Sequence, residues 1–136
     1  MKNAFKLFLG VLVVVLVTQC REKELKQKIH DPNEKKVSIV RLIAVPDLYD
    51  KKTVQVKGFV NIDFEDCVIY LSKEDFEHEL YKNGVWIDLS KDEFKKLSGF
   101  DEQYVRLEGI FDRTNNGHMG DYSGAITHVA NITLLK

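Results

Sequence analysis

The stretch Thr53–Phe64, TVQVKGFVNIDF, carries the most regular pattern in the chain. Its even positions are apolar apart from Gly58, and its odd positions are polar apart from Phe59. An alternation with a period of two places one face of a β-strand against a core and the other in solvent. The stretch therefore predicts one long strand, and Gly58 near its centre predicts a bend or bulge.

Further elements follow from shorter patterns along the chain. Segments with a short helical pattern or a capping serine occur at Ser38–Ala44, from Ser72 to a stop signal near Asn83-Gly84, and from Ser90 to Gly99, where Ser90 and Glu93 form a capping-box pattern. Four more segments have the length and residue types of strands: Cys67–Leu71, Val85–Leu89, Tyr104–Asp112 and a segment within Ser123–Leu135.

These elements predict a mainly β domain, α+β by content, over residues 37–136. Val54–Gly58 and Val105–Gly109 share an apolar-polar-apolar-charged-glycine layout. The strands of a small barrel must coil sharply, and a glycine at the same position in two strands suggests such a barrel. Five strands with a helix between the third and the fourth predict a five-stranded OB-like barrel with short helices.

The N-terminus has the layout of a bacterial export signal that ends at a cysteine. Lys2 and Lys6 are followed by an apolar run over Leu7–Val17, and then by Cys20. This run is too short for a ~30 Å bilayer core, which needs roughly 20 residues, but it fits a signal peptide. Residues 1–19 are therefore predicted to be a lipoprotein-type signal peptide, with lipid on Cys20. Because Gln19 is larger than the usual small residue, cleavage elsewhere or an uncleaved anchor stays open.

Residues 20–36 are predicted to form a charged tether between the membrane and the domain. The segment is rich in charges of both signs and poor in apolar residues. Loss of Lys2 and Lys6 with the signal leaves 18 of the 20 basic residues against 21 acidic ones. This balance and the expected envelope location argue against nucleic acid as a partner.

Three stretches of the domain carry a resemblance to a known group of proteins. They are Val54–Val60 (VQVKGFV), Ile69–Ser72 (IYLS) and Gly117–Ile126 (GHMGDYSGAI). Over most of the chain after the tether, the domain resembles an uncharacterised bacterial lipoprotein-like family with an OB-fold-like domain. The resemblance implies the fold and brings no known activity.

Two aromatic residues on the polar phase of their strands are candidates for ligand contact. Phe59 and Trp86 are predicted to face outward, where an OB barrel can stack aromatic rings on a ligand. The favoured interpretation is that the helical insert after Ser72 covers them, through Phe76 and Leu80, as a second small core.

A glycine-rich loop contributes the remaining candidate contacts, which are His118, Met119 and Tyr122. Gly117 and Gly120 permit a positive φ in a tight loop. His118 is expected to hydrogen-bond to backbone groups and to hold this loop, which would border a ligand site.

The sequence does not predict an enzyme. His118, Asp121 and His128 are the candidate metal ligands, but their spacing matches no zinc motif. Ser123 lacks the Gly-x-Ser-x-Gly turn of a hydrolase. Cys67 lies in an apolar stretch and is expected to be a buried structural residue. No catalytic residue, metal or cofactor is therefore expected.

Together these features predict a membrane-anchored, extracytoplasmic binding module without chemistry of its own. It is expected in the bacterial cell envelope, on the periplasmic or surface side. Its partners would be the membrane, through the N-terminal lipid, and a protein or small envelope ligand. One alternative is an inhibitor or immunity protein against an envelope hydrolase or toxin, inserting a loop such as Thr114–Met119. The other is a metal-dependent envelope enzyme.

Overall fold

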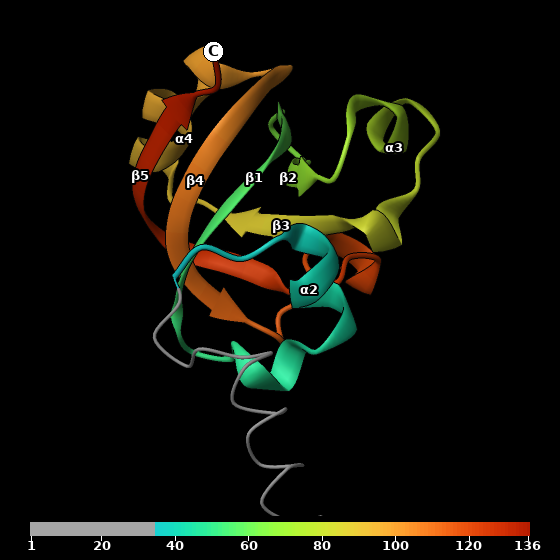
Figure 1. The fold of residues 1–136 in the computed structure, drawn as a ribbon. Helices are drawn as coiled ribbons and strands as arrows, with labels where there is room; N and C mark the ends of the chain where they lie inside the picture. The colour runs from blue at the N-terminus through green and yellow to red at the C-terminus, as the bar shows by residue number, and fades with distance from the viewer. Residues whose placement is uncertain (1–34) are drawn as a thin grey trace, which may run out of the picture. The chain divides into compact units, whose positions relative to one another are not determined.

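The computed structural model describes residues 35–136, in which five strands close into a barrel (Figure 1). Neighbouring strands follow the order β1-β2-β3-β5-β4, and the barrel closes between β4 and β1. Strands β3 and β5 pair in parallel, and all other pairs are antiparallel. The mainly β, OB-like barrel with short helices is thereby confirmed. The strands are β1 (Thr53–Ile62), β2 (Cys67–Tyr70), β3 (Gly84–Asp88), β4 (Gln103–Asp112) and β5 (Ala125–Leu134).

Strand β1 is long because it pairs with both of its neighbours. Residues Thr53–Val60 pair with β4, and Phe59–Ile62 pair with β2. Gly58 lies at this transition, where an added Cβ would come within 2.3 Å of the Tyr70 carbonyl oxygen. The predicted continuation of the buried face to Phe64 is wrong, since Phe64 is 85% exposed. The chain leaves the strand at Asp63, where the backbones of Asp63 and Asp66 exchange hydrogen bonds across the hairpin turn.

The helices are short and begin at the predicted caps. The Ser72 hydroxyl accepts a hydrogen bond from the Asp75 backbone at the start of α3 (Lys73–Glu77). Ser90 and Glu93 form the predicted capping box of α4 (Lys91–Leu97). The segment after Ser72 was expected to stay helical towards Asn83, but Glu79 adopts a φ of 53° and turns the chain. The other elements are α2 (Ile39–Ala44), η1 (Pro46–Leu48), η2 (Tyr81–Asn83), η3 (Ser98–Phe100) and η4 (His118–Gly120).

The main core fills the barrel and extends to two of the helices. Val56, Val60 and Leu107 have no exposed surface, and Leu42 of α2 and Leu97 of α4 belong to the same cluster. At about 1.5–3 kcal/mol for each fully buried large aliphatic side chain, burial of this cluster supplies the main stabilisation of the barrel.

The first residues that the structure describes form backbone hydrogen bonds with β1. The Lys35 carbonyl accepts a hydrogen bond of 2.6 Å from the Gln55 backbone, and the Gln55 carbonyl accepts one of 3.0 Å from Val37. Lys35 and Lys36 are thus tied to β1. The predicted signal peptide, the predicted lipid site at Cys20 and the rest of the predicted tether lie outside the described residues. Within residues 35–136, no helix has the length and apolar character needed to cross a membrane.

Candidate ligand-binding groove

The outer face of strands β1 and β2 is covered by an aromatic cluster. Phe59 is only 2% exposed, and its ring centroid lies 5.7 Å from that of Phe76 and 5.4 Å from that of Tyr104. Helix α3 therefore covers this face, which confirms the interpretation of a second small core. Leu80 is 48% exposed and is not buried in that core. The proposed contact role of Phe59 does not fit this position, because its ring packs against Phe76 and Tyr104 and is almost fully removed from solvent.

Tyr122 joins the same cluster and connects two loops. It is 5% exposed, and its ring centroid lies 5.5 Å from that of Trp86 and 6.5 Å from that of Tyr70. Its hydroxyl donates a hydrogen bond to the Asp66 carboxylate in the β1–β2 hairpin. Burial first, and this hydrogen bond second, raise the pKa of Tyr122 above its usual range. Tyr122 is therefore a buried structural residue, which corrects its assignment as a contact.

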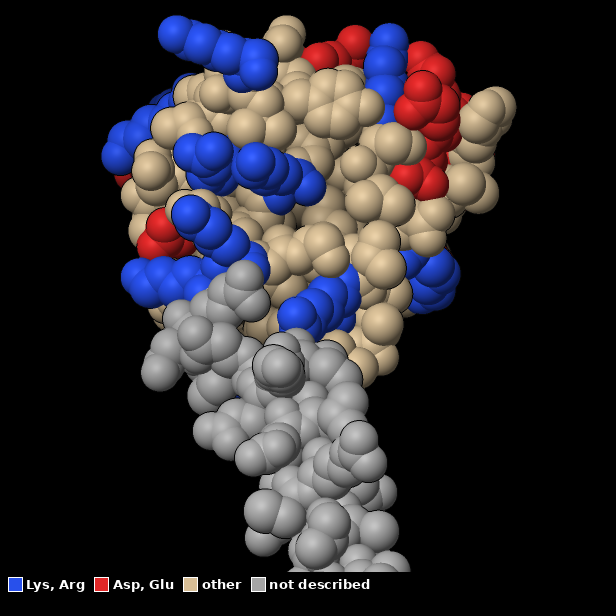
Figure 2. All heavy atoms as spheres, in the orientation of Figure 1, with Lys and Arg blue, Asp and Glu red and all other residues tan. Residues whose placement is uncertain are grey.

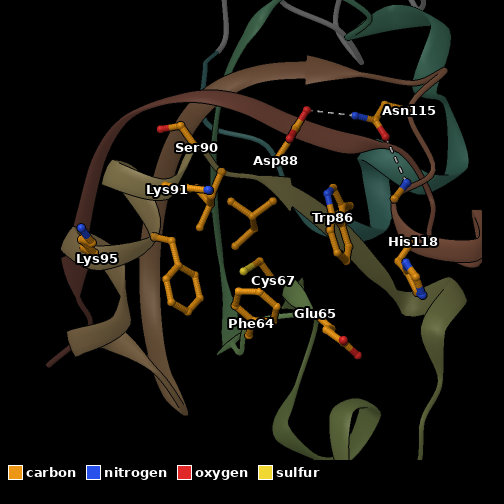
Figure 3. A pocket seen from close by; sticks show the side chains of 14 residues that line it. Phe64, Glu65, Cys67, Trp86, Asp88, Ser90, Lys91, Lys95, Asn115 and His118 are labelled. Carbon is orange, nitrogen blue, oxygen red and sulfur yellow. Dashed lines mark hydrogen bonds between the residues drawn. The ribbon is translucent and has the colours of Figure 1, made fainter.

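An open groove lies beside this covered face, with a cavity volume of about 1090 Å³ (Figure 3). The β1–β2 hairpin, β3, helix α4 and the loop after β4 each contribute to its walls. Three aromatic rings line it from separate elements: Phe64 from the hairpin, Trp86 from β3 and Phe94 from α4. In an OB fold, the β1–β2 and β4–β5 loops border the usual ligand site. In this protein, the same two loops line the groove, whereas the strand face between them is partly covered by aromatic residues.

The loop after β4 is held by asparagine side chains. Asn115 accepts a hydrogen bond of 3.1 Å from the Gly117 backbone and donates one of 3.3 Å to Asp88. Asn116 accepts one of 3.3 Å from the Gly124 backbone. His118 was expected to hold the loop, but within residues 35–136 its side chain makes no hydrogen bond. The side-chain amides of Asn115 and Asn116 bind the loop backbone in place of His118, because an asparagine can hydrogen-bond to backbone groups of its own turn.

Gly117 brings the loop against the face of Trp86. Its φ is +67°, and an added Cβ would lie 2.6 Å from the indole ring. Gly120 has a φ of +78°, so both predicted positive-φ glycines are confirmed. This close approach fixes one wall of the groove, because Trp86 is clamped between the loop and Tyr122.

The candidate contact residues therefore separate into three groups. Trp86 and His118 line the groove. Met119 is 82% exposed at a φ of 58° and points away from the core. Phe59 and Tyr122 are buried. Sequence reasoning missed Phe64 and Phe94, although an apolar residue between acidic neighbours at a hairpin tip was a visible signal for the first.

Charged groups of both signs surround the aromatic floor of the groove. Lys91 and Lys95 lie along α4, and Glu65 and Asp88 lie on the other walls (Figure 3). Such mixed charges suit the orientation of a polar or charged ligand, while the rings provide apolar contact.

The groove also contains Cys67, whose thiol is protonated at neutral pH. Burial first, then the nearby Asp66, Asp63 and Asp101 carboxylates, raise the pKa of Cys67 to about 11. Its Sγ lies 3.2 Å from the Asp63 carbonyl oxygen, to which it donates. The thiolate is the nucleophile and metal ligand, so this environment favours a structural thiol.

The candidate metal ligands do not form a cluster. His128 lies on β5 beside Thr127, with 3.1 Å between Nδ1 and the hydroxyl oxygen, whereas His118 lines the groove. Within the described part of the chain, no three His, Cys, Asp or Glu side chains are placed to hold a metal ion.

Comparison with known proteins assigns no family. No family model and no curated protein matches the chain. Among solved structures, the chain is similar to a protein described as a "putative aspartyl-tRNA synthetase" from Leishmania major Friedlin, with a TM-score of 0.44 and 11% sequence identity. The match covers 77% of this chain and 21% of that one, so the chain spans about a fifth of its length. A likeness of this size carries no functional conclusion.

Proposed function

We propose that the protein is a membrane-anchored, extracytoplasmic binding module of the bacterial envelope that acts without chemistry of its own. Its groove would receive a segment of a partner protein or a small envelope ligand. The observation that carries this proposal is the convergence of Phe64, Trp86 and Phe94, from three separate elements, on one open groove. The predicted export signal that ends at Cys20 supports the proposed location.

Phe64 is the best candidate for the main contact. An 85% exposed phenylalanine at a hairpin tip leaves a large apolar surface in water. Aromatic residues that bury 150–250 Å² dominate the energetics of interfaces, and hot-spot substitutions cost about 2 kcal/mol or more. The wide opening of the groove favours an extended peptide over a fully enclosed small molecule.

Site-specific photo-cross-linking in native membranes tests this proposal. A cross-linking amino acid at position 64 is expected to give a discrete adduct. The matched control places the same residue at Leu134, which is 54% exposed on β5 outside the groove. Phe64→Ala is expected to weaken binding of the captured partner about 30-fold, which corresponds to 2 kcal/mol. Equal labelling from both positions, or no adduct from position 64, would contradict the proposal.

The alternative of an inhibitor or immunity protein is favoured by one further observation. Met119 is 82% exposed at the tip of a loop that Asn115 and Asn116 hold in place. A rigid loop with an exposed apolar tip loses little entropy when it enters an active site. Met119→Ala is then expected to abolish protection against an envelope lytic enzyme, whereas Phe64→Ala preserves it. If deletion of the gene leaves cells equally resistant to lytic enzymes and toxins, this alternative fails.

A further inference from the structure

A second surface, on strands β1 and β4, presents an unusual pair of like charges. Lys57 and Arg106 are directly opposite each other in the antiparallel register, and both are exposed. Like charges at directly opposed positions destabilise a strand pair. Gln55 and Glu108 form another opposed pair on the same two strands, and there the carboxylate has partners. Glu108 accepts a hydrogen bond of 3.2 Å from Gln55 Nε2 and lies 3.5 Å from Lys35 Nζ. Within residues 35–136, neither Lys57 nor Arg106 forms an ion pair.

Lys36 completes a basic hollow with an apolar floor. The hollow has a volume of about 360 Å³ and is bordered by Lys36, Lys57 and Arg106, while Val37, Ile39 and Leu71 provide its apolar surface. Like Lys57 and Arg106, Lys36 forms no ion pair within the described residues. Figure 2 shows Lys and Arg side chains gathered over β1 and β4 on this face, whereas the larger group of Asp and Glu side chains lies at its upper right. Among residues 35–136, these three exposed cations are therefore not neutralised by an ion pair.

The position of this hollow in the chain points to its ligand. Lys36 lies next to Lys35, the first residue of the described domain, and the expected lipid site Cys20 precedes Lys35 by fifteen residues. Fifteen residues span at most about 50 Å, so the anchored domain stays close to its membrane. Inner and outer leaflets that contain anionic phospholipids attract basic residues near their surface.

We propose that the basic hollow of Lys36, Lys57 and Arg106 binds the phosphate groups of anionic phospholipids and thereby orients the domain on its membrane. The ammonium and guanidinium groups would contact headgroup phosphates, with Arg106 able to bind two oxygens of one phosphate. The apolar floor, including Leu71, which is 43% exposed, would lie against the interfacial region. The inference rests on the membrane attachment proposed above and is independent of the groove.

Lysine footprinting on vesicles tests the proposal with the full chain. The protein is reconstituted into vesicles of phosphatidylcholine alone, or with about one third phosphatidylglycerol. Accessible lysines are acylated and quantified by mass spectrometry, after flotation has established attachment. We expect phosphatidylglycerol to protect Lys36 and Lys57, while Lys91 and Lys95, which line the groove, serve as internal controls. Protection is expected to vanish at 1 M salt, where the Debye length is about 3 Å.

Two variants and one added ligand make the outcomes distinct. Arg106→Gln is expected to reduce the ratio of protected to unprotected Lys57 about fivefold. The matched control Arg113→Gln removes a cation that is already paired with Asp47 and is expected to leave this ratio unchanged. Sodium phosphate added to phosphatidylcholine vesicles tests soluble phosphate as the source, and equal protection there would overturn a lipid ligand.

The remaining outcomes separate this inference from the proposed function. Chains that float with both vesicle types but show equal acylation of Lys57 would overturn the orientation on lipid and leave groove binding unaffected. Chains that fail to float would overturn membrane attachment and this inference with it. Loss of cross-linking at position 64 together with normal protection of Lys57 would overturn only the groove.

Discussion

Replacement of Gly117 by alanine tests how the loop and Trp86 shape the groove. Gly117 has a φ of 67° and a ψ of −159°, a conformation that is nearly restricted to glycine and costs other residues about 1–3 kcal/mol. The added Cβ would also lie 2.6–2.7 Å from three atoms of the indole ring. The ring has little room to move, because Tyr122 packs beside it at 5.5 Å. Overpacking of this kind costs about 1–3 kcal/mol.

The expected result for Gly117→Ala is a loss of about 2–4 kcal/mol in the free energy of unfolding, because release of the loop relieves part of the strain. With a urea dependence of ~1–2 kcal/mol per molar, the unfolding midpoint falls by about 2 M. Trp86 is the single tryptophan of the chain, so its fluorescence reports both unfolding and a displaced loop. A change in native-state emission is therefore expected before any denaturant is added.

Two other glycines provide matched controls. An added Cβ at Gly120 meets no atom within 4 Å, although its φ is 78°, so Gly120→Ala is expected to cost only about 1–2 kcal/mol for the backbone. Gly99 also has open space and no positive φ, so Gly99→Ala is expected to change stability by less than about 0.5 kcal/mol. The reasoning is refuted if Gly117→Ala is no less stable than Gly120→Ala and the native emission of Trp86 is unchanged.

Three further predictions concern single groups. Because the pKa of Cys67 is raised to about 11 from 9.0, its alkylation at pH 8 is expected to be roughly a hundredfold slower than that of an unhindered thiol, and equal rates in native and unfolded protein would contradict this. The Lys51 ammonium holds the pKa of Asp112 below its usual 3.8, so the ion pair stabilises the fold at neutral pH and loses this effect as the pH falls below about 4. Lys51→Gln is expected to flatten the dependence of the urea midpoint between pH 6 and pH 3, and an unchanged slope would remove Asp112 from the acid response. Metabolic labelling with a fatty acid is expected to mark the wild type and not Cys20→Ala, and persistent label in the variant would place the lipid elsewhere.

Much of the barrel was predictable because its determinants are local. The alternation in Thr53–Phe64 favours a half-buried strand, and a serine whose hydroxyl accepts from the backbone amide three residues later favours the start of a helix. The caps at Ser72 and Ser90 were therefore found at the predicted residues. The end of β1 was misplaced, since the turn at Asp63 depends on hydrogen bonds with Asp66 across the hairpin.

The candidate site was less predictable, because its residues are distant in sequence. Phe64, Trp86 and Phe94 share no sequence pattern, and they line one groove only in the folded domain, where the β1–β2 hairpin, β3 and α4 border the same space. Phe59 and Tyr122 carry aromatic rings that suit ligand contact, yet α3 and Trp86 cover them. A side chain's chemistry is visible in the sequence, whereas its exposure depends on every element that packs against it.

The sequence by itself determined the strands, the capped helices and the phase of each buried face, since these depend on neighbours within a few residues. It also determined the predicted export signal and the charges along the chain. The tertiary structure alone decided which aromatic rings face solvent, and it placed Lys57 opposite Arg106 across two strands about fifty residues apart. The reason is physical: closing the barrel fixes a register between distant segments, and only that register brings their side chains into contact.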